Sequence, residues 1–175
     1  MSKALASKLA NDMGLLGFYK FVDARQRKDI DGEIENGAYD WFRAAGRAFD
    51  GDAERLAEGG VQDLLESMQP ALDIEGVKLT DFEQSHSEQG YTLRVGTHNY
   101  TLWSEGERRR SWELTTDRTI TLTNLWLATA GSEERIHVLG GAGGHDAIFV
   151  LLTPAMRECI AKSGVFGKGD IPVAL

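Results

Sequence analysis

The residues with the most evident potential for chemistry lie in a glycine-rich stretch, 140–144, that is followed by His145 and Asp146. A glycine-rich loop can offer several backbone N–H groups to an anion, and adjacent His and Asp side chains can both ligate a divalent ion. A phosphate-binding loop also requires a Gly-Lys-Ser/Thr end and a following helix, whereas here a strand is expected next and no lysine is near. We therefore interpret 140–146 as a hairpin loop. The alternative is a small hydrolase, or a metal- or anion-dependent enzyme, that uses His145 and Asp146.

The other histidines and the single cysteine do not extend this pair into a recognisable site. We expect His86 and His98 in turns and His137 on the polar face of a strand, and no two histidines have the i, i+3 or i+4 spacing that joins ligands on a helix. Cys159 falls in the middle of a predicted helix, away from the N-terminus that would lower its pKa, so we interpret it as a core thiol. The sequence thus predicts no metal, no cofactor and no catalytic residue.

A short acidic motif resembles the middle of an EF-hand calcium loop, because Asp29 and Asp31 precede Gly32. With Gly32 at the sixth position of such a loop, Arg27 would occupy the first position and Ala38 the twelfth. Both positions require carboxylates, so the calcium motif fails. We interpret the segment as an acidic loop.

The formal net charge is −8, and the acidity is concentrated in residues 29–88, which contain sixteen acidic and four basic residues. Residues 1–28 have an excess of basic side chains, and residues 89–175 contain nine of each sign. Such a negative field opposes nucleic-acid phosphates and anionic lipids, and it favours a basic partner or simple solubility. Solvated outer faces of two helices would account for the same charge.

From this charge we hypothesise a non-enzymatic protein-binding module, such as an intracellular inhibitor or immunity-type protein. A structural or assembly subunit is a further alternative, and the oligomeric state stays open. The carboxylates expected to face a basic protein partner are Asp29, Asp31, Glu33, Glu35 and Asp40.

Size and composition are those of one ordinary globular domain. The chain has 175 residues, of which 42% are apolar and 26% charged, close to the average for globular proteins. An internal disulfide is impossible with one cysteine, no signal peptide is recognisable, and no apolar run approaches the about 20 residues that span a bilayer. We expect a cytoplasmic protein without a membrane segment.

The first part of the chain has helical spacing of its apolar residues. We predict a helix over 2–13 with a further helical run to about 24, a helix over 38–49, and a third helix that starts after Asp52 and stops at Pro70. Asp52 offers a side-chain cap for the third helix.

From about residue 76 the apolar period changes to two, which is typical of half-buried strands. Strands are expected at 77–80 and 91–95, followed by a four-residue loop, 96–99, and a strand over 100–103. The basic run Arg108–Arg110 is interpreted as a charged, solvated hairpin.

Later segments are less uniform. Trp112 and Leu114 indicate another strand. Residues 116–130 combine β-branched residues with helix caps and fit either structure, and we favour a helix after residue 121. Residues 135–138 alternate like a strand, and the apolar run 147–152 is typical of a central strand buried on both faces.

The last helix has the clearest local signature, with Thr153 as N-cap, Pro154 at the first helical position and Gly164 after the end. The whole chain is thus predicted to be a single α+β domain over 1–175. N-terminal helices would pack on a mostly antiparallel sheet of four to six strands, with a C-terminal helix docked on it. Its parts would be mainly helical over 1–70, mainly strand over 76–152, helical over 153–164, and an extended tail over 165–175.

Overall fold

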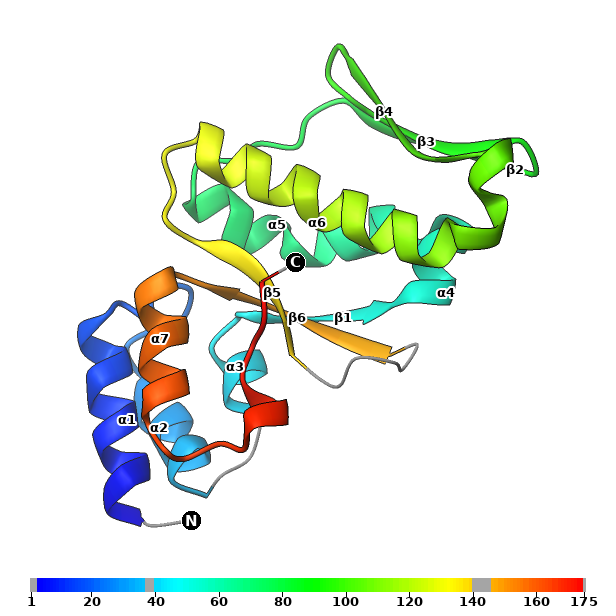
Figure 1. Ribbon diagram of the computed structural model, residues 1–175. Helices are drawn as coiled ribbons and strands as arrows, with labels where there is room; N and C mark the ends of the chain where they lie inside the picture. Colours follow the sequence, from blue (N-terminus) through cyan, green and yellow to red (C-terminus); the bar gives the residue numbers. More distant parts are fainter. Residues whose placement is uncertain (1–2, 37–39, 140–145, 175) are drawn as a thin grey trace. The chain divides into compact units, whose positions relative to one another are not determined.

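The computed structural model describes residues 3–36, 40–139 and 146–174, and it shows an α+β fold with two three-stranded antiparallel sheets (Figure 1). The helices are α1 (Lys3–Leu15), α2 (Arg27–Asn36), α3 (Asp40–Ala44), α4 (Ala53–Arg55), α5 (Val61–Ile74), α6 (Ser111–Thr129) and α7 (Pro154–Lys162), with a π-helical turn η1 (Leu56–Gly60) and 3-10 turns η2 (Glu105–Arg110) and η3 (Lys168–Asp170). The strands are β1 (Ala48–Asp52), β2 (Phe82–Ser87), β3 (Gly90–Val95), β4 (His98–Ser104), β5 (Arg135–Leu139) and β6 (Asp146–Leu152).

The chain forms two compact units. The first contains the chain up to Phe49 together with β5, most of β6 and the residues from α7 to Ala174, and the second is built mainly from Asp50–Ser132. The boundary between Phe49 and Asp50 falls inside strand β1.

In the first unit, helices α1, α2 and α7 lie together (Figure 1) and bury an aromatic cluster. The ring of Trp41 stacks on that of Phe42 with 4.0 Å between centroids, and it lies 4.8 Å from the ring of Phe18. Met13 from α1 and Ile160 from α7 complete this core, and both are almost fully buried. Burial of these large apolar surfaces is the main stabilising term of the unit.

Strand β6 is central in the first sheet, whose order is β1-β6-β5. Its residues Phe149–Leu152 are all buried, so the predicted central strand is confirmed. Strand β5 pairs antiparallel with β6, and the outer edge of β5 is covered by the end of the chain. Val138 and Val173 exchange two backbone hydrogen bonds of 2.8 and 2.9 Å, which leaves less exposed strand edge for unwanted pairing.

In the second unit, α6 packs against β4 of the β2-β3-β4 sheet, and η1 contacts α5, α6 and β2. The π-helical turn η1 interrupts the helix before α5, where Gly59 adopts a φ of 108° that favours glycine. Side chains of the sheet satisfy the backbone groups freed there. The Gln84 amide donates to the Gly59 carbonyl at 2.8 Å, and the Val61 N–H donates to the Tyr91 hydroxyl at 3.3 Å. The kink therefore joins the helical layer to the sheet.

Several predictions about elements are confirmed. The α+β class, the strand over 91–95 with Tyr91 and Leu93 buried, and the C-terminal helix all stand. Thr153 caps α7 by accepting the Met156 N–H at 3.2 Å, and Gly164 follows the helix with a φ of 66°. Asp52 caps α4 by accepting the Arg55 N–H at 2.9 Å.

Other predictions in the first half were wrong. The segment interpreted as an acidic loop is helix α2, because Ile30 and Ile34 are one turn apart and both are buried. The predicted helix 38–49 is only α3, and Phe49 lies in strand β1. The run 16–24 forms turns without a helix. The third helix passes through Pro70 and ends at Ile74.

The second half also differs from its predicted pattern. Residues 77–80 form no strand, and the hairpin loop that starts at Gly96 has two residues, since Val95 pairs with His98. The proposed Arg108–Arg110 hairpin is the 3-10 turn η2, and Trp112 with Leu114 belongs to α6. A capping box fixes the start of η2, where the Ser104 N–H and hydroxyl both donate hydrogen bonds to the Glu107 carboxylate.

Candidate functional site

Helix α2 carries most of the carboxylates predicted to face a partner. Its apolar side chains Ile30 and Ile34 point into the core, and this orientation leaves Asp29 exposed and Glu33 partly exposed on other faces. Asp29 and Glu33 are one turn apart, so their side chains are neighbours on the helix surface. Within the described part of the chain, neither forms a salt bridge, and both are available to an outside cation.

Asp31 lies on the same helix but is engaged within the protein. The Tyr19 hydroxyl donates a hydrogen bond to its carboxylate, and the Arg27 guanidinium lies 3.9 Å away. Burial, followed by this bond to a carboxylate, raises the pKa of Tyr19 above its ordinary value. Asp31 therefore helps to hold α2 against the turn after α1, and it is a weaker candidate for partner binding than Asp29.

The two other carboxylates predicted to face a partner, Glu35 and Asp40, cannot both be placed beside Asp29 and Glu33. Asp40 is exposed at the first residue of α3. Glu35 lies near the end of α2, and its side chain lies outside the described residues.

Most of the acidic segment belongs to the second unit. Of the sixteen acidic residues in 29–88, eleven fall in 50–88, where they face only two basic residues, Arg55 and Lys78. Ten of the eleven are exposed. The exception is the buried Glu75, which accepts a 2.7 Å hydrogen bond from the Ser132 hydroxyl.

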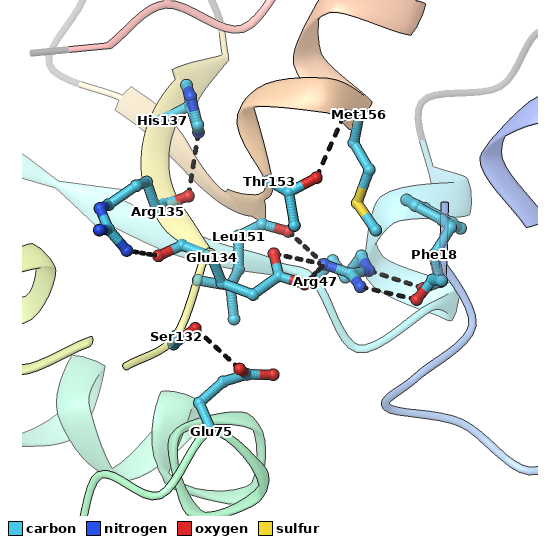
Figure 2. A network of polar contacts seen from close by, with 11 residues as sticks. Phe18, Arg47, Glu75, Ser132, Glu134, Arg135, His137, Leu151, Thr153 and Met156 are labelled. Atoms are coloured by element: carbon cyan, nitrogen blue, oxygen red, sulfur yellow. Dashed lines mark hydrogen bonds and ion pairs between the residues drawn. The ribbon is translucent and has the colours of Figure 1, made fainter. Parts of the chain in front are cut away.

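A fully buried cation lies in the first unit. Figure 2 shows Arg47 surrounded by acceptors: both carboxylate oxygens of Glu134 at 2.9 and 3.0 Å, the Phe18 carbonyl at 2.6 Å and the Leu151 carbonyl at 2.7 Å. Its guanidinium also lies 4.5 Å from the centre of the Phe21 ring. Arg47 and Glu134 side chains are 0% and 4% exposed, so neither can reach a ligand without unfolding. This network holds the first unit together.

The histidines predicted in turns or on a polar face lie elsewhere. His86 is in β2, His98 begins β4, and both are exposed. His137 is buried, because residues on both faces of β5 are covered, and its Nδ1 lies 2.9 Å from the Arg135 carbonyl oxygen (Figure 2). Burial, and then the nearby Arg157 charge, lower the pKa of His137.

The residues of the alternative enzyme hypothesis cannot be assembled into a site. His145 and the glycine-rich stretch lie outside the described residues, and Asp146 begins β6 with its side chain also outside them. Cys159 is partly buried in α7, and burial raises the pKa of its thiol, which opposes nucleophilic reactivity. No group of three His, Cys, Asp or Glu residues suited to a metal ion occurs among the described residues.

Sequence patterns did not reveal a surface hollow of about 220 Å³ in the second unit. Its lining comes from five separate elements, η1, β2, β4, η2 and α6, and from the turn after β2. The main polar and aromatic residues that line it are Glu58, His86, Glu88, Trp103, Arg108 and Trp112. The packing of η1, η2 and α6 with the paired strands β2, β3 and β4 brings these residues together, and nothing in the spacing along the chain indicates it.

The described part of the chain contains no helix long and apolar enough to cross a membrane. Comparison of the chain with protein-family models, with curated proteins and with solved structures gives no match. Its function has to be argued from its own residues.

Proposed function

We propose that the chain is a non-enzymatic protein-binding module that presents acidic side chains to a basic protein partner, as an inhibitor or immunity-type protein does. The observation that carries the proposal is the construction of α2. Two buried isoleucines fix the rotation of this helix about its axis, so Asp29 is exposed and Glu33 partly exposed, and neither forms a salt bridge with another described residue.

Exposed carboxylates of this kind act mainly on association. They raise the rate at which a basic partner arrives in the correct orientation, and they contribute less to the lifetime of the complex. The ten exposed acidic residues of 50–88 add to the negative field of the whole chain. The same field would slow the approach of nucleic acid.

The test begins with affinity capture from the native host and identification of the bound protein by mass spectrometry. The association rate of the purified pair is then measured by stopped-flow at increasing salt. We expect the rate to fall with salt, since exposed charges are screened beyond a Debye length of about 10 Å at 0.1 M. An association rate independent of salt would refute the proposal.

Charge variants assign the effect to α2. The double variant Asp29→Asn with Glu33→Gln should lower the association rate severalfold and change the dissociation rate less. The matched control, Glu105→Gln with Glu133→Gln, removes the same charge from two exposed positions outside 29–88. Equal effects of the two pairs would mean that only total charge matters, and α2 would not be the binding surface.

A further inference from the structure

The hollow in the second unit is built on a row of aromatic side chains across the sheet. His86 of β2 is opposite Tyr91 of β3, and Tyr91 is opposite Trp103 of β4, so all three lie on one face. The rings are in edge contact, with centroids of His86 and Trp103 5.7 Å apart and those of His86 and Tyr91 5.2 Å apart. Tyr91 and Trp103 are buried, while His86 is exposed on the edge strand. The aromatic face of the sheet therefore reaches solvent at the hollow.

Two further groups shape the wall of the hollow. Trp112, in the first turn of α6, is 39% exposed, so part of its indole surface is accessible. The exposed carboxylates of Glu58, from η1, and Glu88, from the turn after β2, also line the hollow. Both belong to the acidic segment. Aromatic rings together with carboxylates form an environment that attracts a cation, because the ring face and the carboxylate both carry negative electrostatic potential.

One lining residue has the opposite charge. Arg108 of η2 is exposed, and it is the cation that the chain itself places at this hollow. With Glu58 and Glu88 it gives the lining a formal charge of −1. Arg108 would repel an incoming cation, whereas it would attract an incoming anion.

We propose that this hollow binds an arginine side chain of the basic protein partner, with the guanidinium against the aromatic rings and its charge balanced by Glu58 and Glu88. This inference rests on the proposed function. Arginine fits better than lysine, because a planar guanidinium stacks on aromatic faces and bonds carboxylates in pairs. The volume of about 220 Å³ is below the roughly 300–1,000 Å³ of small-molecule pockets, so a single side chain is the expected occupant. Buried arginine and aromatic contacts commonly dominate the affinity of an interface.

The probe for the test is N-acetyl-arginine-N-methylamide, titrated into the full ¹⁵N-labelled chain and followed by NMR. We expect saturable shifts of the indole N–H signals of Trp103 and Trp112, while the matching glutamate derivative produces none. Glu58→Gln with Glu88→Gln should weaken binding of the probe at least fivefold. Glu66→Gln with Glu54→Gln, at exposed positions outside the lining, should leave it unchanged.

The sign of the Arg108 effect decides between a cation and an anion site. Arg108→Gln should strengthen binding of the arginine probe, because it removes a like charge. If Arg108→Gln leaves or weakens binding of the arginine probe, or if the glutamate derivative binds instead, the proposal is overturned. All five substitutions are at exposed positions, and an unchanged melting temperature shows that each variant is folded.

The test of the arginine site and the test of the protein-binding function can fail independently. Salt-dependent binding of a basic partner with no response to the arginine probe would overturn the arginine site and leave the protein-binding proposal standing. A positive probe titration with no salt-dependent partner would leave a cation site and overturn the protein-binding module.

Discussion

Replacing Arg47 by methionine should destabilise the first unit strongly. Methionine has a similar reach but carries no charge, so the Glu134 carboxylate would stay buried without its cation. Removing one partner of a buried ion pair costs about 3–5 kcal/mol. The carbonyl groups of Phe18 and Leu151 would also lose their donors, which are 2.6 and 2.7 Å away. These carbonyls belong to the turn after α1 and to the central strand β6, so the loss spreads across the unit.

The assay is urea unfolding followed by tryptophan fluorescence, because Trp41 lies in the same core. A loss of about 3–5 kcal/mol corresponds to a fall in melting temperature of roughly 6–20 °C for a chain of this size. Arg25→Met is the matched control: this arginine is exposed in the same unit, and its replacement should change the free energy of unfolding by less than about 0.5 kcal/mol.

A second variant isolates the charge. Arg47→Met combined with Glu134→Leu removes the unpaired carboxylate, and it should be more stable than Arg47→Met alone. It should still be less stable than the natural chain, since the Phe18 and Leu151 carbonyls stay without donors. If Arg47→Met costs less than about 1 kcal/mol, or if the double variant is the less stable of the two, the buried pair does not have the role assigned to it.

Three further predictions concern stability. Burial lowers the pKa of His137 below 6.5, so the unfolded chain binds a proton more readily; the free energy of unfolding should fall as the pH drops below about 6.5, and His137→Phe should reduce this fall. Hydrogen bonds from Arg118, and then from Ser104, lower the pKa of Glu107 to about 2, so its stabilising effect should disappear between pH about 4.5 and about 2, and Glu107→Gln should flatten that part of the profile. Gly90 has a φ of 155°, and a Cβ there would lie 2.9 Å from the Trp103 carbonyl oxygen, so Gly90→Ala should cost about 1–3 kcal/mol in chemical unfolding.

Each of these predictions has its own contrary result. A pH profile that is the same for His137→Phe and the natural chain would show that other groups control stability near neutrality. An acid limb unchanged in Glu107→Gln would mean that the Arg118 contact is not maintained in solution. Gly96→Ala is a useful comparison for Gly90→Ala, because no heavy atom lies within 4 Å of its Cβ position and only its φ of 57° opposes the change.

Local sequence signals predicted an element correctly where residues within that element determine its structure. Thr153, Pro154 and Gly164 set both ends of α7 through hydrogen bonds and dihedral preferences within a few residues. The apolar run of β6 likewise required burial on both faces. The α+β class and the C-terminal helix follow from such signals.

Tertiary contacts determine the secondary structure of the elements that were not predicted from the sequence. Helix α2 contains Gly32 and seven charged or amide residues around only two isoleucines, and it forms because Ile30 and Ile34 bury against the core. In α6 the β-branched residues favoured a strand, yet Thr115 and Thr119 are buried one turn apart, which is a helical period. The spacing of four between these threonines was the available signal.

The candidate site could be predicted only in part, because charge is a property of the sequence and shape is not. Counting carboxylates placed the acidity in residues 29–88. It could not show that Asp31 would be occupied by Tyr19, or that strand pairing would align His86 with Tyr91 and Trp103.

The acidic segment is therefore two surfaces with different chemistry, one on each compact unit. On α2, Asp29 is exposed and Glu33 partly exposed, so both can steer a basic partner through their charge. In the second unit, Glu58 and Glu88 line an aromatic hollow, where a desolvated cation can contribute to the lifetime of a complex. Neutralising α2 should then act on the association rate, whereas neutralising Glu58 and Glu88 should act on the dissociation rate. A partner that responds to both kinds of change in the same rate constant would argue against this division.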